Sequence, residues 1–384
     1  MIQRILEGKI TDRIASFVPG REGNHRKAII IVGARQTGKT SLLHMKYPEN
    51  DARVLWLNGD ELDVQRLFED ITADRLRRYL GKKDILIIDE AQRIRDVGLR
   101  LKLITDNMKD IQLIATGSSS FDLANKVNEP LTGRKQTYQL FPLSFEELVN
   151  DHGLLEEKRM IPERLVFGSY PEVVTSPGQE KTILRELTDS YLYKDILSLD
   201  GIQKPEKLTK LLQALALQVG AQVSFNELAQ LCSMDPKTVE RYITVLEQAY
   251  IIFRLSSFSR NARNELKNSR KVYFYDNGVR NAIIANFSSV ELRTDIGALW
   301  ENYLVSERMK YLGYTDRWVH SWFWRTKTRQ GIDLVEEEEG TLRSYEFKWS
   351  THKRARQPTS FSNAYPDVAF AVITPDNVED FLLP

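Results

Sequence analysis

Cysteine is nearly absent from this 384-residue chain, which has a single thiol, Cys232. One thiol excludes an internal disulfide and a cysteine-based zinc site, and it is typical of a protein kept in a reducing cytoplasm. Long apolar runs are also absent, since stretches such as AIIIVG (28–33) are far shorter than the roughly 20 residues that cross a bilayer. The first residues, MIQRILEGKITDRI, carry charges every few positions and lack the apolar segment of a signal peptide. These absences predict a cytoplasmic protein without a membrane-spanning helix.

An excess of one charge is missing as well. The chain has 54 Lys and Arg against 53 Asp and Glu, so its overall charge gives no indication of a nucleic-acid partner. Histidine is scarce, and its 5 residues include no i, i+4 pair that would suggest a zinc site. With 42% hydrophobic and 28% charged residues, a chain of this length is expected to form two or three globular domains.

A phosphate-binding loop follows the apolar run 28–32. The segment Gly33-Ala-Arg-Gln-Thr-Gly-Lys-Thr40 matches G-x-x-x-x-G-K-[ST] at every fixed position, between a β-branched strand and a helix. Backbone N–H groups of such a loop bind phosphate, while Lys39 and the Thr40 hydroxyl are expected to contact the β- and γ-phosphates and Mg²⁺. A chance match on a strand–turn–helix is the alternative. The residues predicted to bind ATP are Gly33, Ala34, Arg35, Gln36, Thr37, Gly38, Lys39, Thr40 and Ser41.

Two further apolar runs end in polar side chains. DILIIDEAQRI (84–94) places Asp89 where a carboxylate can reach the metal ion, and Glu90 where it can polarise an attacking water. Glu90 therefore predicts hydrolysis rather than binding alone. IQLIATGSSS (111–120) places Ser118 as a sensor of the γ-phosphate or the water, with a helix N-cap as the alternative. Alternating strands and helices of this kind predict a doubly wound α/β sheet.

The order of the motifs resembles one family. VGARQTGKTSLL, LIIDEAQRI, ATGSSSFDL, LTGRKQTYQLFPLSFEEL and FGSYPEVV occur as they do in AAA-type ATP-binding proteins of bacteria and archaea that carry an uncharacterised C-terminal domain. The resemblance covers nearly the whole chain. It implies a P-loop ATPase with sites between subunits, and therefore a homo-oligomer such as a ring. It also makes Arg134 the candidate arginine finger or sensor, in cis or across a subunit boundary; the alternative is a surface arginine paired with Glu146 or Glu147.

Residues 224–276 have the pattern of a winged helix. Ser224-Phe-Asn-Glu227 is a capping box for one helix, and Asp235-Pro236 begins a second. The second helix is expected to have an apolar face of Val239, Ile243, Leu246 and Tyr250.

Two apolar strands then flank a basic hairpin, 260–271, whose five cations and one carboxylate give a local charge of about +4. Such side chains would neutralise DNA phosphates without reading the base sequence. A packing module with a solvated hairpin is the alternative. The predicted nucleic-acid contacts are Lys237, Arg241, Arg260, Arg263, Lys267, Arg270 and Lys271.

Residues 297–374 have the pattern helix, three strands, helix, strand, which resembles a restriction-endonuclease-like core with its (D/E)-x-K motif. The resemblance implies a second Mg²⁺ site at Glu301, Asp333 and Glu346, with Lys348 as its catalytic lysine. Ile332 stands where the usual proline precedes the aspartate, which weakens the prediction of cleavage. The acidic run 336–339 is expected to be a solvated strand end or turn.

The expected domains are a P-loop AAA-type ATPase at 1–150, a helical lid or connector at 151–222, a winged helix at 223–280 and a nuclease-like α/β domain at 281–384. The leading hypothesis is a Mg²⁺-dependent ATPase that binds, remodels or translocates on DNA as a homo-oligomer. The alternative is a regulatory switch that binds a protein partner through its C-terminal domain. A nuclease gated by ATP is a third hypothesis.

Overall fold

The computed structural model describes residues 2–15, 26–118, 125–189, 204–259, 270–315, 317–326, 328, 330–350 and 355–384. The chain divides into two compact units. The first comprises residues 1–141 together with 248–250, and the second comprises residues 142–247 and 251–384. Within the described ranges, no helix combines the length and apolarity needed to cross a membrane.

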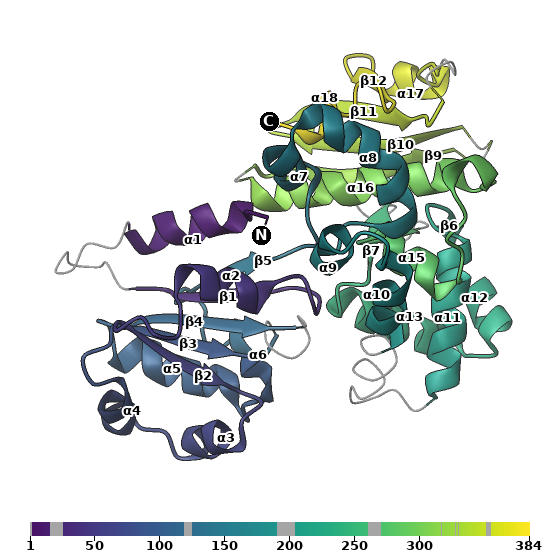
Figure 1. Cartoon of the computed structure of the whole chain (residues 1–384). Coiled ribbons are helices and arrows are strands. Elements are labelled where there is room, and N and C mark those ends of the chain that lie inside the picture. Colours follow the sequence, from purple (N-terminus) through teal and green to yellow (C-terminus); the bar gives the residue numbers. More distant parts are fainter. Residues whose placement is uncertain are drawn as a thin grey trace. The chain divides into compact units, whose positions relative to one another are not determined.

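The first unit contains a five-stranded sheet in the order β2-β3-β4-β1-β5, and every pairing is parallel (Figure 1). The predicted α/β fold class is confirmed. Figure 1 shows α2 over one face of the sheet and α5 over the other. The strands are β1 (Ala28–Val32), β2 (Val54–Asn58), β3 (Ile85–Asp89), β4 (Gln112–Gly117) and β5 (Lys135–Gln139). The helices are α1 (Ile5–Ala15), α2 (Lys39–Lys46), α3 (Leu62–Glu69), α4 (Ala73–Leu80), η1 (Ala91–Arg93), α5 (Val97–Asn107) and α6 (Asn125–Asn128).

The burial of each strand explains why the apolar strands were predictable from the sequence and β5 was not. Strands β1, β3 and β4 are buried at every residue, as expected for apolar runs covered on both faces of a parallel sheet. Strand β5 was not among the predicted strands, because its sequence KQTYQ is polar and only half-buried at the edge of the sheet. Parallel strands end at the same edge, so the residues that follow β1, β2, β3 and β4 meet there.

The second unit begins with helices and a small antiparallel sheet in the order β6-β8-β7. The predicted helix–turn–helix is present as α12 and α13, and the strands after it are β7 and β8. The elements are α7 (Phe145–His152), α8 (Leu154–Phe167), α9 (Pro171–Thr175), α10 (Glu180–Leu187), α11 (Pro205–Leu217), β6 (Gln222–Val223), α12 (Phe225–Cys232), α13 (Pro236–Gln248), β7 (Ile252–Ser256), β8 (Arg270–Phe274), α15 (Asn277–Ile283) and η4 (Val290–Leu292).

One detail of α13 differs from the prediction. Val239, Ile243 and Leu246 are buried as expected, but Tyr250 lies beyond the end of the helix with a φ of 58°. The apolar face is instead extended by Tyr242 and Val245.

The C-terminal part forms a four-stranded sheet in the order β12-β11-β10-β9. Strands β11 and β12 are parallel, and the other pairings are antiparallel. The predicted order of helix, three strands, helix and strand is confirmed. The elements are α16 (Ile296–Tyr314), β9 (His320–Arg325), β10 (Gly331–Glu338), β11 (Thr341–Phe347), α17 (Thr359–Ala364), β12 (Ala369–Ile373) and α18 (Glu379–Leu382).

The two sheets of the second unit share one hydrophobic core. Phe253 and Tyr273 of the small sheet are buried in the same cluster as Trp300 of α16 and Phe323 of β9. A backbone hydrogen bond of 2.6 Å from Phe258 N to Phe323 O joins the chain after β7 to β9. The winged-helix elements therefore pack as part of the C-terminal body.

The expectation for the acidic run is wrong at Glu336. This side chain is 1% exposed, and the Arg308 guanidinium donates to it twice, at 2.9 and 2.7 Å. Residue 336 faces the core because α16 supplies a buried cation opposite it, and a paired, hydrogen-bonded carboxylate tolerates burial.

Candidate active site in the first unit

The loop between β1 and α2 is held close to the neighbouring strand. Gly33 has a φ of 156°, and a Cβ atom there would lie 2.1 Å from the carbonyl oxygen of Leu140. Gly38 has a φ of 92° and precedes α2, whose N-terminus has no side-chain cap. The first N–H groups of α2 are therefore available to an anion, as phosphate binding requires.

A pocket of about 360 Å³ opens beside this loop. Gly33, Ala34 and Thr37, which the sequence also assigned to ATP binding, are buried behind it and shape the loop. Asp60, which the sequence did not indicate, lines the pocket because it follows β2 at the same edge of the sheet. The lining residues are Arg35, Gln36, Gly38, Lys39, Thr40, Ser41, Asp60 and Glu90.

Lys39 is positioned by the loop itself. Its side chain is 5% exposed, and Nζ donates hydrogen bonds to the carbonyls of Gly33 at 2.9 Å and Ala34 at 2.8 Å. Burial lowers the pKa of Lys39 to about 8, against the opposing effect of the nearby Glu90 and Asp89 carboxylates. An anionic ligand beside the ammonium would raise this pKa again.

Thr40 and Asp89 form the part of the site that fits a magnesium ion. Thr40 Oγ1 donates a hydrogen bond of 2.8 Å to Asp89 Oδ2, and Thr116 Oγ1 donates to the other carboxylate oxygen. Hydroxyl and carboxylate oxygens are the ligands that Mg²⁺ prefers, and the ion keeps waters and phosphate oxygens as its remaining ligands. Thr40 and Asp89 are thus the residues that would hold it, and the ion would supply positive charge at the phosphates.

Glu90 is fixed at the pocket by its neighbours. Its backbone N–H donates to Thr116 Oγ1 at 3.1 Å, and its carboxylate accepts a hydrogen bond from Gln92 Nε2. The backbone of Glu90 has a φ of 47°, a costly conformation for a residue with a side chain. Gly59 lies so close that a Cβ atom there would be 2.4 Å from the carbonyl oxygen of Glu90. The strained turn aims the carboxylate at the pocket.

Gln92 was missed by the sequence analysis. It is 8% exposed, and its Nε2 also donates to Ser118 Oγ at 3.1 Å, which joins β4 to the turn after β3. The structure thus brings Ser118 to Glu90 through Gln92. The alternative reading of Ser118 as a helix N-cap concerns residues 119–124, which lie outside the described ranges.

Arg4 was also missed, because no motif surrounds it. Its side chain is 5% exposed, with Nη1 donating to the carbonyl of Thr37 and Nη2 to that of Phe141, both at 2.7 Å. One guanidinium therefore joins the phosphate-binding loop to the last residue of the first unit.

Arg134 lies at the end of the sheet where the parallel strands begin, whereas the phosphate-binding loop lies at the end where they finish. It precedes β5, and its carbonyl accepts the hydrogen bond of Ala28 N at the beginning of β1, whereas the loop follows the end of β1. Arg134 pairs with Asp106 at 2.5 Å, so the alternative prediction that it pairs with Glu146 or Glu147 is wrong. A second pocket, of about 520 Å³, lies here, lined by Arg26, Lys27, Thr105, Asp106, Lys109, Thr132, Gly133 and Arg134.

The residues assigned to a nuclease-like centre lie near one another in the second unit. The pKa of Asp333 is raised to about 7, chiefly by burial and then by the negative charge of Glu301. The Glu346 carboxylate raises it to a smaller extent. Lys348 Nζ donates to Glu346 at 2.6 Å. However, Lys271 Nζ lies 2.7 Å from Glu301 and 4.0 Å from Asp333.

These residues do not fit a divalent cation as they are arranged, because an ammonium group already lies between two of the three carboxylates. Across the described part of the chain, no group of three or more His, Cys, Asp or Glu side chains is arranged to hold a metal ion.

The predicted nucleic-acid contacts are placed unevenly. Lys237 and Arg241 are exposed on α13. Arg270 lies 4.0 Å from Glu240 and over the Phe225 ring, and Lys271 is buried against Glu301. Arg260, Arg263 and Lys267 lie outside the described residues.

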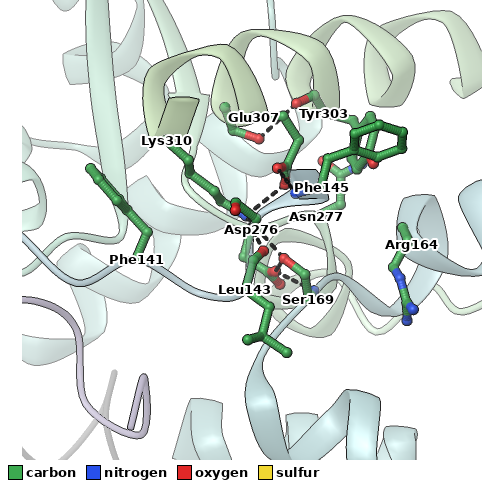
Figure 2. Close-up of polar contacts among 12 residues, drawn as sticks. Phe141, Leu143, Phe145, Arg164, Ser169, Asp276, Asn277, Tyr303, Glu307 and Lys310 are labelled. Atoms are coloured by element: carbon green, nitrogen blue, oxygen red, sulfur yellow. Dashed lines mark hydrogen bonds and ion pairs between the residues drawn. The ribbon is translucent and has the colours of Figure 1, made fainter. Parts of the chain in front are cut away.

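A buried ionic network also joins residues 143–145, Ser169 and α16 in the second unit (Figure 2). Lys310 is 1% exposed, and Nζ donates to Glu307 at 2.6 Å, Ser169 Oγ at 2.9 Å and the Leu143 carbonyl at 3.0 Å. Glu307 accepts from Phe145 N at 2.7 Å. Burial raises the pKa of Glu307 in spite of the Lys310 ammonium beside it. All three protons of the ammonium have acceptors, so this network is structural.

The comparison with known proteins agrees with a phosphate-binding site in the first unit. Residues 25–149 match the model of an AAA domain. Together with the loop, Asp89 and Glu90, this match defines the first unit as an AAA-type domain of the P-loop ATPase class. Residues 158–290 match a domain of unknown function (DUF8612), and residues 296–380 match another (DUF4143).

The curated relatives are uncharacterized proteins of bacteria and an archaeon. One of Mycobacterium tuberculosis is 25% identical over 334 residues, covering 85% of this chain and 72% of its own. One of Haemophilus influenzae is 25% identical, covering 65% and 68%. One of Methanocaldococcus jannaschii is 24% identical, covering 61% and 57%. Among solved structures, the RuvB Holliday junction branch migration motor of Thermotoga maritima is 17% identical and covers 69% of this chain and 95% of its own, but its TM-score of 0.33 is too low to carry weight.

Proposed function

We propose that the chain is a Mg²⁺-dependent ATPase that couples ATP hydrolysis to the binding, remodelling or translocation of DNA. The observation that carries the ATPase part is the meeting of Thr40, Asp89 and Glu90 beside an uncapped helix N-terminus. Phosphate binding, metal binding and water activation each have a residue type suited to them at that edge of the sheet.

In this proposal Lys39 and the loop N–H groups bind the phosphates, and Thr40 and Asp89 hold the ion. Glu90 accepts the proton of the attacking water while Gln92 and Ser118 hold its carboxylate in place. Arg134 completes the site of a neighbouring copy, because it directly precedes β5, at the end of the sheet away from its own loop. A homo-oligomer follows from that assignment.

The DNA part is supported by the exposed Lys237 and Arg241. They lie on α13, the second helix of a helix–turn–helix, which is the helix that enters the major groove in proteins of this type. Both side chains are exposed, so they can reach phosphates without rearrangement of the core.

The test is ATP turnover by the purified chain with and without double-stranded DNA. We expect DNA to stimulate turnover several-fold, and Lys39→Ala to abolish it in both conditions. Replacing both Lys237 and Arg241 by Ala should remove the stimulation and leave the basal rate. Arg185→Ala, an exposed arginine on α10, serves as the matched control. Turnover that DNA does not change would refute the coupling and favour a regulatory switch with a protein partner.

A further inference from the structure

Lys271 is inserted into the carboxylate cluster of the C-terminal sheet. It lies on β8, its side chain is 9% exposed, and Nζ is 2.7 Å from Glu301 Oε1 on α16 and 4.0 Å from Asp333 Oδ1 on β10. Arg270, its neighbour along the strand, points to the opposite face, towards Glu240. The alternation of the strand therefore commits residue 271 to the cluster.

The carboxylates around Lys271 are held by other donors as well. Glu301 Oε1 accepts a second hydrogen bond, of 2.7 Å, from the Tyr273 hydroxyl, two residues along the same strand. Asp333 Oδ2 accepts from Phe347 N at 2.9 Å. These bonds fix the two carboxylates on either side of the ammonium, which makes the position of the cation a built feature of the fold.

Gly220 lies beside Glu301. It has a φ of 71°, and a Cβ atom there would lie 3.3 Å from the Glu301 carboxyl carbon. A side chain at residue 220 would therefore crowd Glu301, and the glycine leaves the space in which this carboxylate pairs with Lys271. The third carboxylate, Glu346, is already paired with Lys348 at 2.6 Å.

We propose that the Lys271 ammonium is a tethered cation that takes the place of a divalent metal ion between Glu301 and Asp333. Three carboxylates then share two lysine ammonium groups, and the centre is completed within the chain. A divalent ion would have to displace Lys271, because two cations at one pair of carboxylates repel each other. The C-terminal domain accordingly acts without a metal ion in this cluster, as a binding or packing domain.

Binding of Mn²⁺ alone, measured by electron paramagnetic resonance without nucleotide, tests this proposal. An Asp89→Asn background removes the metal ligand of the ATP site. We expect Mn²⁺ binding at the cluster to be too weak to detect in this background, and to become at least 10-fold tighter than the detection limit when Lys271→Met is added. Adding Glu301→Gln should abolish the gain, and Lys271→Arg, which keeps the charge, should not produce it.

Two results would overturn the proposal. One is Mn²⁺ binding by the Asp89→Asn background that Asp333→Asn removes; the other is a folded Lys271→Met variant that gains no binding.

Chemical modification of the wild-type chain gives a test that does not depend on the folding of a variant. Reductive methylation followed by peptide mapping should leave Lys271 unmodified, with and without millimolar Mn²⁺, while the exposed Lys237 is methylated in both. Methylation of Lys271 that appears only when Mn²⁺ is added would show that the metal displaces it, and the proposal would fall.

Discussion

Gln92 donates a hydrogen bond of 3.1 Å to the Ser118 hydroxyl, and the same amide nitrogen donates to the Glu90 carboxylate. Three polar side chains from two neighbouring strand ends are thereby joined. The carboxylate that is expected to activate water is held in one orientation before any ligand binds.

Glu90→Gln should therefore retain ATP binding and lose turnover by about 100-fold or more, because the amide cannot accept a proton from water. Steady-state phosphate release and equilibrium binding of a fluorescent nucleotide would measure the two effects separately. Hydrolysis at the wild-type rate would mean that another group activates the water.

Gln92→Ala should lower kcat by roughly 10-fold with little change in KM, because the carboxylate keeps its basicity and loses its orientation. Asn107→Ala, which removes an amide bonded to a helix carbonyl away from the pocket, is the control. A rise in KM without a change in kcat would place Gln92 in nucleotide binding instead.

Arg134→Ala should reduce turnover at least 10-fold if the guanidinium acts on a neighbouring copy. Mixing this inactive variant with Lys39→Ala should recover part of the activity, since one variant keeps an intact loop and the other an intact arginine. Recovery is measured as phosphate release at a fixed total concentration. An unaltered rate for Arg134→Ala alone would rule out the assignment, and Arg95→Ala, an exposed arginine, is the control.

Lys310→Met should destabilise the second unit by about 3–5 kcal/mol, because Glu307 would remain buried without its cation. The double variant Lys310→Met, Glu307→Gln should be less destabilised than the sum of the single variants, since no charge is left unpaired. Urea unfolding followed by tryptophan fluorescence provides the comparison. Additive effects would show that the two charges do not stabilise each other.

The lowered pKa of Asp295 predicts that the protein loses stability in acid. Burial opposes ionisation of this carboxyl, but hydrogen bonds from Arg293 and Arg280 outweigh it and lower its pKa from 3.8 to about 2. A carboxyl whose pKa is lowered by folding stabilises the fold at pH values above its ordinary pKa. This contribution is lost as the pH falls from about 4 towards 2. Asp295→Asn should cost on the order of 1–2 kcal/mol at neutral pH, after allowance for partial exposure.

The measurement is the urea midpoint of the wild type and Asp295→Asn at pH 7, 4 and 3. The difference between the two proteins should narrow as the pH falls. A constant difference would mean that the pKa of this carboxyl is the same in the folded and the unfolded protein.

The sequence was most informative where a backbone conformation restricts residue type. The fixed positions 33 and 38–40 imply a loop with a left-handed turn before a helix, and the apolar runs before Asp89 and Ser118 imply buried parallel strands. These features are local, so neighbouring residues reveal them. The parallel sheet then brings the strand ends together without further information.

Contacts between distant positions were not predictable in the same way. Lys271 belongs to a basic stretch, and nothing in its neighbourhood indicates that Glu301 would bind it instead of a phosphate. The pairing of Glu336 was not predictable for the same reason, because its partner Arg308 comes from a different element 28 residues away. Pairings of this kind depend on which faces of two elements pack, which single-sequence patterns leave undetermined.

Arg4 has a practical consequence for anyone who isolates the ATPase part of the chain. A fragment designed on the AAA match would begin near residue 25 and omit the guanidinium that bonds to the carbonyls of Thr37 and Phe141. Such a fragment would leave two carbonyl groups without their donor, one of them in the loop that receives the phosphates. A weak affinity measured on it would then reflect the missing Arg4 side chain rather than the chemistry of the pocket.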